Sequence, residues 1–268
     1  MNAGCLAPNP AFDAALLARI EDAGINASAP REQRWIDGWL VRFSAAKAKR
    51  ARCIQAVAAG RLGVGDKLAL CRPVYEAAGL DLYVRITPFS QPAGLDAALA
   101  ALGMDGIDET RVMVLKSLDA LAPRSRDVTS PLRIATVGAS DFAAWVGKER
   151  GSAAAEQQAH ADRIALSPVP HHGVLAFDDA GETVGSGQVV IEGALAGIYD
   201  VFTAERHRGR GVAEEVCRHL LGVATAAGAT VGYLQVDAAN DPARRIYRRM
   251  GFVDGYSYHY RTPPRAAP

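Results

Sequence analysis

The stretch Asp200-Val-Phe-Thr-Ala-Glu-Arg-His-Arg-Gly-Arg-Gly-Val-Ala213 runs from a strand pattern through a loop rich in glycine and arginine into a helix pattern. Glycine in such a loop lets the backbone curl so that successive N–H groups point inward. The start of the following helix adds free N–H groups and the positive end of the helix dipole. Three arginines in the loop add formal charge. Together these features predict a site for a pyrophosphate.

The residues after the loop narrow the choice of phosphate ligand. A P-loop needs Gly-Lys-Ser/Thr, which is absent, and a dinucleotide fingerprint needs a third glycine where Glu214 stands. The stretch instead matches Arg/Gln-x-x-Gly-x-Gly/Ala through Arg208, Gly211 and Ala213. It resembles motif A of the GNAT superfamily (Gcn5-related N-acetyltransferases), whose loop holds the pyrophosphate of acetyl-CoA. A basic turn that only joins a strand to a helix is the alternative.

A second motif lies one helix and one strand further along, in Asn240-Asp-Pro-Ala-Arg-Arg-Ile-Tyr-Arg-Arg-Met-Gly-Phe252. Asp241 and Pro242 are expected to open a helix there. The segment is similar to the GNAT pattern at Asn240, Ala243, Tyr247, Gly251 and Phe252. The resemblance, which covers roughly residues 132–261, implies that Asn240 contacts the pantetheine arm and that Tyr247 protonates the departing thiolate. An ordinary core tyrosine is the alternative for Tyr247.

The family resemblance implies a complete set of site residues and a direct transfer of the acetyl group. Acetyl-CoA, the co-substrate, would be bound by Val201, Phe202, Thr203, Arg208, Gly209, Arg210, Gly211, Val212, Ala213, Asn240, Ala243 and Tyr247. The backbone of residues 201–203 would stabilise the tetrahedral oxyanion.

A carboxylate must remove the proton from the attacking amine, because an alkyl ammonium has a pKa of about 10.4. Asp200 is the first candidate, since it directly precedes the acetyl-binding segment, and Glu192 and Asp237 are the others. A structural hydrogen-bond acceptor is the alternative for Asp200. No metal site is expected, because His171 and His172 stand in a predicted loop over residues 167–173 with no third ligand at useful spacing.

Element order predicts an α/β chain of two tandem GNAT-like domains, with a mixed twisted sheet flanked by helices. We expect a degenerate first domain in residues 1–122, a linker in 123–131 and the catalytic domain in 132–268. The first half repeats the strand–helix–strand–helix–strand order, after a strand expected over 35–43. Its strand at 52–57 is not followed by an arginine-flanked turn, and Leu99 stands where Tyr247 stands in the second half.

Composition excludes several classes of protein. The 268 residues carry a net charge of +1, which argues against a nucleic-acid surface. No apolar run approaches the length of a membrane span. The four cysteines are too dispersed for a zinc or redox motif and are expected to be reduced, which favours a cytoplasmic protein.

The expected function is therefore N-acetylation of a primary amine on a small molecule or amino acid. A protein N-terminal or lysine acetyltransferase, or a non-catalytic acetyl-CoA-binding module, are the alternatives. The acceptor pocket is expected in residues 141–166 and the first half, with Trp145, His160 and Tyr199 as candidate lining residues. The sequence leaves open whether two copies form a homodimer.

Overall fold

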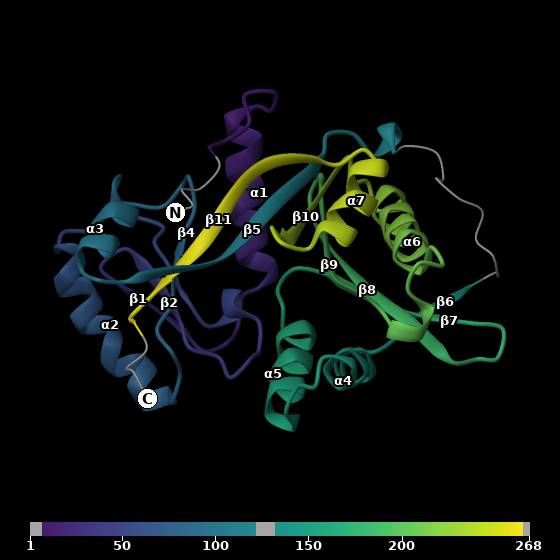
Figure 1. The fold of residues 1–268 in the computed structure, drawn as a ribbon, viewed down its shortest axis with the longest axis horizontal. Coiled ribbons are helices and arrows are strands. Elements are labelled where there is room, and N and C mark those ends of the chain that lie inside the picture. The colour runs from purple at the N-terminus through teal and green to yellow at the C-terminus, as the bar shows by residue number, and fades with distance from the viewer. Residues whose placement is uncertain (1–6, 122–131, 265–268) are drawn as a thin grey trace.

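The computed structural model describes residues 7–121 and 132–264, which form one mixed sheet of eleven strands with helices on both faces (Figure 1). The strand order across the sheet is β1-β2-β3-β4-β11-β5-β10-β9-β8-β7-β6. The strands are β1 (Gln33–Ile36), β2 (Trp39–Arg42), β3 (Ile54–Gln55), β4 (Val84–Ile86), β5 (Asp105–Leu115), β6 (Arg133–Thr136), β7 (His171–Phe177), β8 (Thr183–Glu192), β9 (Leu195–Thr203), β10 (Val231–Asp237) and β11 (Val253–Thr262). The helices are α1 (Ala14–Ala27), α2 (Val64–Ala78), α3 (Leu95–Ala101), α4 (Ala139–Glu149), α5 (Ala154–Ala165), α6 (Val212–Ala226) and α7 (Asp241–Arg249), with short 3-10 turns η1 (Lys49–Ala51), η2 (Leu118–Ala120) and η3 (Glu205–His207). The predicted α/β class is confirmed.

The two halves repeat the same order of elements at a fixed spacing. β3, α2, β4, α3 and β5 in the first half correspond to β9, α6, β10, α7 and β11 in the second. Val64 begins α2 and Val212 begins α6, 148 positions later (212 minus 64). The same shift relates Gly103 to Gly251, which turn the chain after α3 and α7 with φ of 79° and 100°. These angles are favourable only for glycine. The structure thus has the tandem arrangement that the sequence predicts.

The last strand of each half lies in the sheet of the other half. β5 pairs with β10 and with β11, and β11 pairs with β4 and with β5, all antiparallel. Figure 1 shows β5 in teal and β11 in yellow running side by side through the middle of the molecule. Neither half can complete its sheet without a strand from the other. The boundaries at 122 and 132 stay a prediction, and the expected linker over 123–131 lies outside the described residues.

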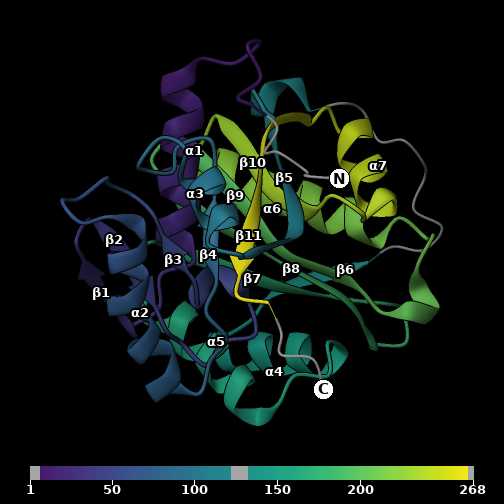
Figure 2. The ribbon, with the colours of Figure 1, turned by 60° about the vertical axis from the view of Figure 1, so that its left-hand side comes forward.

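Helices cover the second half of the sheet on two faces. Val174 and Ala176 of β7 pack in the core that α6 and α7 cover, whereas Leu175 between them packs against Phe142 of α4. Figure 2 shows α4 and α5 on the side of β7 and β8 opposite to α6. The loop before α6 therefore lies on the opposite face of the sheet from α4 and α5.

Two local predictions are wrong. Residues 35–43 form two strands, because Asp37 and Gly38 have φ of 41° and 82° and turn the chain into a hairpin. Asp-Gly is a strong signal for such a turn. His171 and His172 lie in β7 and not in a loop, since their backbones pair with Val190 and Val189 of β8.

Among the helices that the structure describes, none is long and apolar enough to cross a membrane.

Met113 tests whether the shared sheet makes the two halves one folding unit. It belongs to β5 of the first half, is fully buried, pairs with Leu234 and packs in the core of α6 and α7. We expect Met113→Ala to lower the free energy of unfolding by about 2–5 kcal/mol. Calorimetry should show one transition in both proteins, shifted to lower temperature in the variant.

The matched control is Leu102→Ala, because Leu102 is 54% exposed and should change stability by less than about 0.5 kcal/mol. Two separate transitions in the wild-type protein, with only one of them moved by Met113→Ala, would contradict a single folding unit.

Candidate active site

β9 and β10 run in parallel and then separate. Their pairing extends from Leu195 and Val231 to Ile198 and Leu234 and then stops. Beyond this point β9 pairs only with β8, and β10 only with β5. Asp200 has a φ of 49°, and the register with β8 shifts beside it, as expected of a β-bulge that bends a strand. We call this divergence, residues 199–203 of β9 against 235–237 of β10, the β9/β10 fork.

The glycine- and arginine-rich loop leads from the fork into α6. Gly209 and Gly211 have φ of 78° and 85°, and Gly211 is the N-cap residue of α6 without a side-chain cap. A Cβ built at either glycine would meet no atom within 4 Å, so the loop backbone is open on one side. Arg208 and Arg210 are exposed, and no described residue forms an ion pair with Arg210. Open N–H groups and exposed guanidinium groups suit an anionic ligand.

Glu214, which lies in the first turn of α6, does not add an uncompensated negative charge. Its Oε1 accepts hydrogen bonds from Nε and Nη2 of Arg218 at 3.1 and 2.9 Å. This neutralised carboxylate is compatible with a phosphate ligand at the start of the helix.

The corresponding loop of the first half is filled by the protein itself. Backbone N–H groups of Arg61 and Leu62 donate to the Asp37 carboxylate at 2.8–3.0 Å, and Lys67 Nζ lies 3.2 Å from Asp37 Oδ2. Hydrogen bonds from Leu62 and Arg61 lower the pKa of Asp37. An internal carboxylate therefore occupies the place where the second half presents open N–H groups.

Tyr247 is buried in the core below α7, with its ring 6.2 Å from that of Phe252 in an edge-on contact. Burial raises the pKa of Tyr247 well above its ordinary value, with a smaller contribution from Cys217, so the hydroxyl stays protonated. No side chain or backbone group in the described part of the chain forms a hydrogen bond with this hydroxyl. It can therefore donate to a ligand.

Asn240, and not Asp241, caps α7. Its Oδ1 accepts a hydrogen bond from Ala243 N at 3.2 Å, and the predicted cap, Asp241, is the first residue of the helix. Asparagine is as good a cap as aspartate, so sequence alone could not separate the two. The Asn240 amide nitrogen remains available for another acceptor.

Asp200 lies directly before residues 201–203, as predicted, but its carboxylate is already engaged. Arg150 Nη1 donates to Oδ1 at 2.6 Å, and Gln188 Nε2 and His160 Nε2 lie 2.5 and 3.2 Å from Oδ2. Burial raises the pKa of Asp200, but Arg150 and His160 outweigh it and hold the pKa well below its usual range. Such a carboxylate is a weak proton acceptor, so these contacts favour a positioning role.

A cavity of about 270 Å³ adjoins Asp200 between α4 and α5. His160 lines it, as predicted. Tyr199 is instead buried and donates to Tyr233 at 2.9 Å, and Trp145 packs edge-on against Phe202. The full lining is Ala46, Lys47, Ala48, Val146, Gly147, Arg150, Ser152, Glu156, Gln157, His160, Arg163 and Asp200. We call this cavity the α4/α5 pocket.

The other two candidates for the general base are engaged in hydrogen bonds within the protein. Glu192 accepts from Asn26 Nδ2 at 3.0 and 3.1 Å, and Asp237 Oδ1 accepts from Ala239 N at 2.8 Å. Within the described ranges there is no group of three or more His, Cys, Asp or Glu side chains placed to hold a metal ion.

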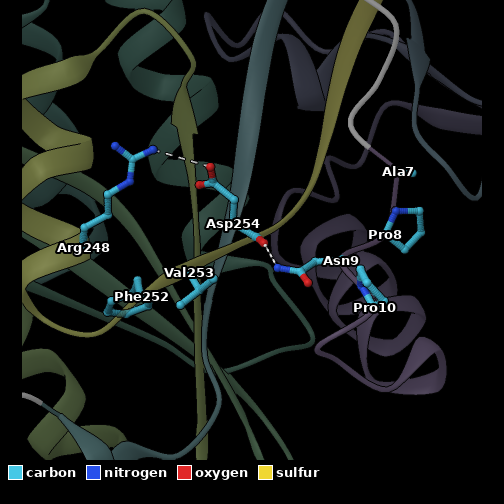
Figure 3. A pocket seen from close by; sticks show the side chains of 8 residues that line it. All are labelled: Ala7, Pro8, Asn9, Pro10, Arg248, Phe252, Val253 and Asp254. Atoms are coloured by element: carbon cyan, nitrogen blue, oxygen red, sulfur yellow. Dashed lines mark hydrogen bonds and ion pairs between the residues drawn. The ribbon is translucent and has the colours of Figure 1, made fainter.

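A second hollow, about 670 Å³, lies at the far end of α7 (Figure 3). The N-terminal segment forms one wall, where Asn9 Nδ2 donates to Asp254 O at 2.9 Å. Arg248 forms part of the other and points toward the Asp254 carboxylate, 3.6 Å away. None of the predicted site residues lines this hollow. The hydrogen bond of Asn9 and the ion pair of Arg248 both go to Asp254 of the protein itself.

Sequence reasoning missed the surroundings of Asp200. Arg163 lies in α5 and Arg150 lies in the turn before it. Lys47 comes from the first half, about 150 residues before Asp200 in the sequence. Only the tertiary fold brings these cations together, and no local pattern marks them.

Comparison with known proteins finds a family match in the second half of the chain. The family described as Acetyltransferase (GNAT) matches residues 141–252. The uncharacterized N-acetyltransferase YobR of Bacillus subtilis is 25% identical over 229 residues, covering 85% of this chain and 91% of its own length.

Solved structures share the fold over most of the chain. A GCN5-related N-acetyltransferase from Kribbella flavida has a TM-score of 0.64 at 20% identity, covering 93% of this chain and 96% of its own. A tandem GNAT protein from the clavulanic acid biosynthesis pathway has a TM-score of 0.58 at 18% identity, covering 78% and 72%. Residues 141–252 are therefore an acetyltransferase domain of the GNAT family, and the fold that the chain shares with solved GNAT structures extends beyond this domain.

Proposed function

We propose that the chain transfers an acetyl group from acetyl-CoA to a primary amine of a small molecule or amino acid, by direct attack of the amine on the thioester. The observation that carries this proposal is the continuity of β9, the loop and α6. One stretch of chain places an opened strand, a glycine-arginine loop and a helix start in series. That series matches a ligand with an acyl group, a flexible arm and a pyrophosphate.

In this arrangement the loop residues 208–213 bind the pyrophosphate through backbone N–H groups and the exposed arginines. The pantetheine arm enters the β9/β10 fork, where residues 201–203 have no partner on β10. Asn240 donates its amide to the arm. Backbone N–H groups of residues 201–203 then face the developing oxyanion, where fixed dipoles lower the barrier without reorganising.

The acceptor amine enters from the α4/α5 pocket on the other face. His160 accepts its proton, because it lines the pocket and lies 3.2 Å from Asp200. Asp200 orients His160 and stabilises the imidazolium that forms. This replaces the prediction that Asp200 itself is the base, since its pKa lies well below its usual range.

Collapse of the tetrahedral intermediate breaks the carbon–sulfur bond after the carbon–nitrogen bond has formed. The departing thiolate takes a proton from Tyr247, whose buried hydroxyl remains protonated at every physiological pH. A pocket of about 270 Å³ fits a small acceptor better than a folded protein surface. This favours a small molecule over the alternative of a protein substrate.

The donor site is tested by calorimetric titration with acetyl-CoA. We expect one site per chain, and we expect Arg208→Ala with Gly211→Asp to abolish binding, because the double change removes a cation and adds a negative side chain where φ is positive. The control is Arg61→Ala with Gly63→Asp in the loop of the first half, where Gly63 corresponds to Gly211 and Arg61 is the arginine of that loop, and it should leave the affinity unchanged. Two sites per chain, or none, would contradict the proposal.

Tyr247→Phe should separate binding from turnover. We expect an unchanged dissociation constant for acetyl-CoA, since the ring and its packing remain, and a turnover at least about tenfold lower because the proton donor is lost. Thiol release with a reactive amine measures the rate. A loss much smaller than tenfold would remove Tyr247 from the mechanism.

His160→Gln should lower kcat by about 10²–10⁴-fold, as for the loss of a general base, with acetyl-CoA affinity unchanged. His219→Gln on the exposed face of α6 is the control and should have no effect. Asp200→Asn should lower kcat in the wild-type background but have little further effect in His160→Gln, because Asp200 acts by holding His160 in place. An equal loss of kcat in both backgrounds would show that Asp200 does not act through His160.

A further inference from the structure

The α4/α5 pocket is built from both halves of the chain. Residues 46–48, which follow β2 in the first half, form the wall opposite α4 and α5. Lys47 Nζ donates to the backbone oxygen of Arg150 at 2.7 Å and so holds the two parts together at the rim. The first half therefore helps to shape the space in which the acceptor would lie.

The charges that line the pocket do not cancel. Three permanent cations, Lys47, Arg150 and Arg163, face two carboxylates, Asp200 and Glu156. Arg150 is paired with Asp200 at 2.6 Å. Glu156 Oε2 accepts from Ala153 N at 3.0 Å, at the start of α5. Among the described residues, neither Lys47 nor Arg163 has a carboxylate partner within ion-pair distance.

Arg163 is the more sheltered of these two cations. Its Nη1 donates to Ala27 O, at the end of α1, at 2.9 Å, and the side chain is otherwise directed at the pocket that it lines. Burial lowers the pKa of Arg163, and Arg50 and Arg150 lower it further, although Asp200 acts in the opposite sense. A sheltered cation in this setting gains most from a nearby anion, because water screens the attraction poorly.

We propose that the acceptor of this enzyme carries an anionic group, a carboxylate, in addition to its reactive amine. Lys47 and Arg163 hold the carboxylate, and the amine lies toward Asp200 and His160. The proposal rests on the proposed acetyl transfer and names its substrate class: amino acids and similar amino carboxylates. The reaction is unchanged, with a carbon–nitrogen bond formed, a carbon–sulfur bond broken, and the amine proton passed to His160.

The test uses pairs of amines that differ only in the carboxylate, each free amino acid against its carboxamide. Thiol release at saturating acetyl-CoA measures kcat/KM, and saturation-transfer NMR in the presence of CoA measures binding without turnover. The wild-type protein should prefer acids over carboxamides by at least about tenfold. Lys47→Glu should abolish this preference, because it raises KM for the acids at least about tenfold more than KM for the carboxamides.

Lys148→Glu is the matched control, because Lys148 is an exposed lysine on α4 that does not line the pocket, and it should retain the preference. Lys47 is chosen over Arg163 since Arg163 also binds the end of α1.

The outcomes separate this inference from the proposed function. Acids that bind, lose binding in Lys47→Glu and are not acetylated would support the pocket and contradict the transferase reaction. Carboxamides turned over as well as acids, with Lys47→Glu indistinguishable from Lys148→Glu, would overturn the anionic acceptor and leave the transferase reaction standing. Failure of every acid to bind and to react would count against both.

Discussion

The structure depends on one interruption in a hydrogen-bonded ladder. β9 and β10 pair through Ile198 and Leu234 and then diverge, while each keeps a partner on its other side. Parallel strands lose ladder hydrogen bonds when they separate, so the divergence must be held open by the rest of the fold. The bulge at Asp200 bends β9 toward β8, and β5 keeps β10 in place. The proposed binding site for acetyl-CoA and the α4/α5 pocket lie on either side of this opening.

The strand that holds β10 comes from the other half of the chain. Because β5 and β11 exchange places, the second half needs the first in order to keep the fork open. The first half has the same order of elements, yet Asp37 fills its loop and Leu99 stands in place of Tyr247. Its contribution to the proposed acetyl-CoA site is therefore structural, and its residues 46–48 supply a wall of the α4/α5 pocket. A repeat whose own ligand-binding loop is filled can still contribute strands and loops to the site of the other repeat.

The sequence predicts the local elements around the candidate site. The turn at Gly209 and Gly211, the helix α6 after it and the helix α7 lie where the pattern predicts them, because turn chemistry and helix ends are encoded locally. The Asp37–Gly38 hairpin is also encoded locally, although the pattern of residues 35–43 predicts a single strand. The partners of Asp200 do not follow from the sequence, because Arg150 and His160 reach it only through the packing of α4 and α5. Lys47 of the first half comes near them only by its hydrogen bond to the Arg150 backbone oxygen. For that reason the structure favours a positioning role for Asp200 over the role of general base that the sequence predicts.

The most direct test of the central claim is amide hydrogen exchange with and without acetyl-CoA. We expect slower exchange on binding at residues 201–203 in the fork and at residues 209–213 in the loop and first turn of α6, because those N–H groups of these segments that lack a partner would then gain one. Exchange at residues 61–65 of the first half should not change, since Asp37 already accepts from that loop. Protection confined to the loop, with the fork unchanged, would contradict an acetyl group held between β9 and β10.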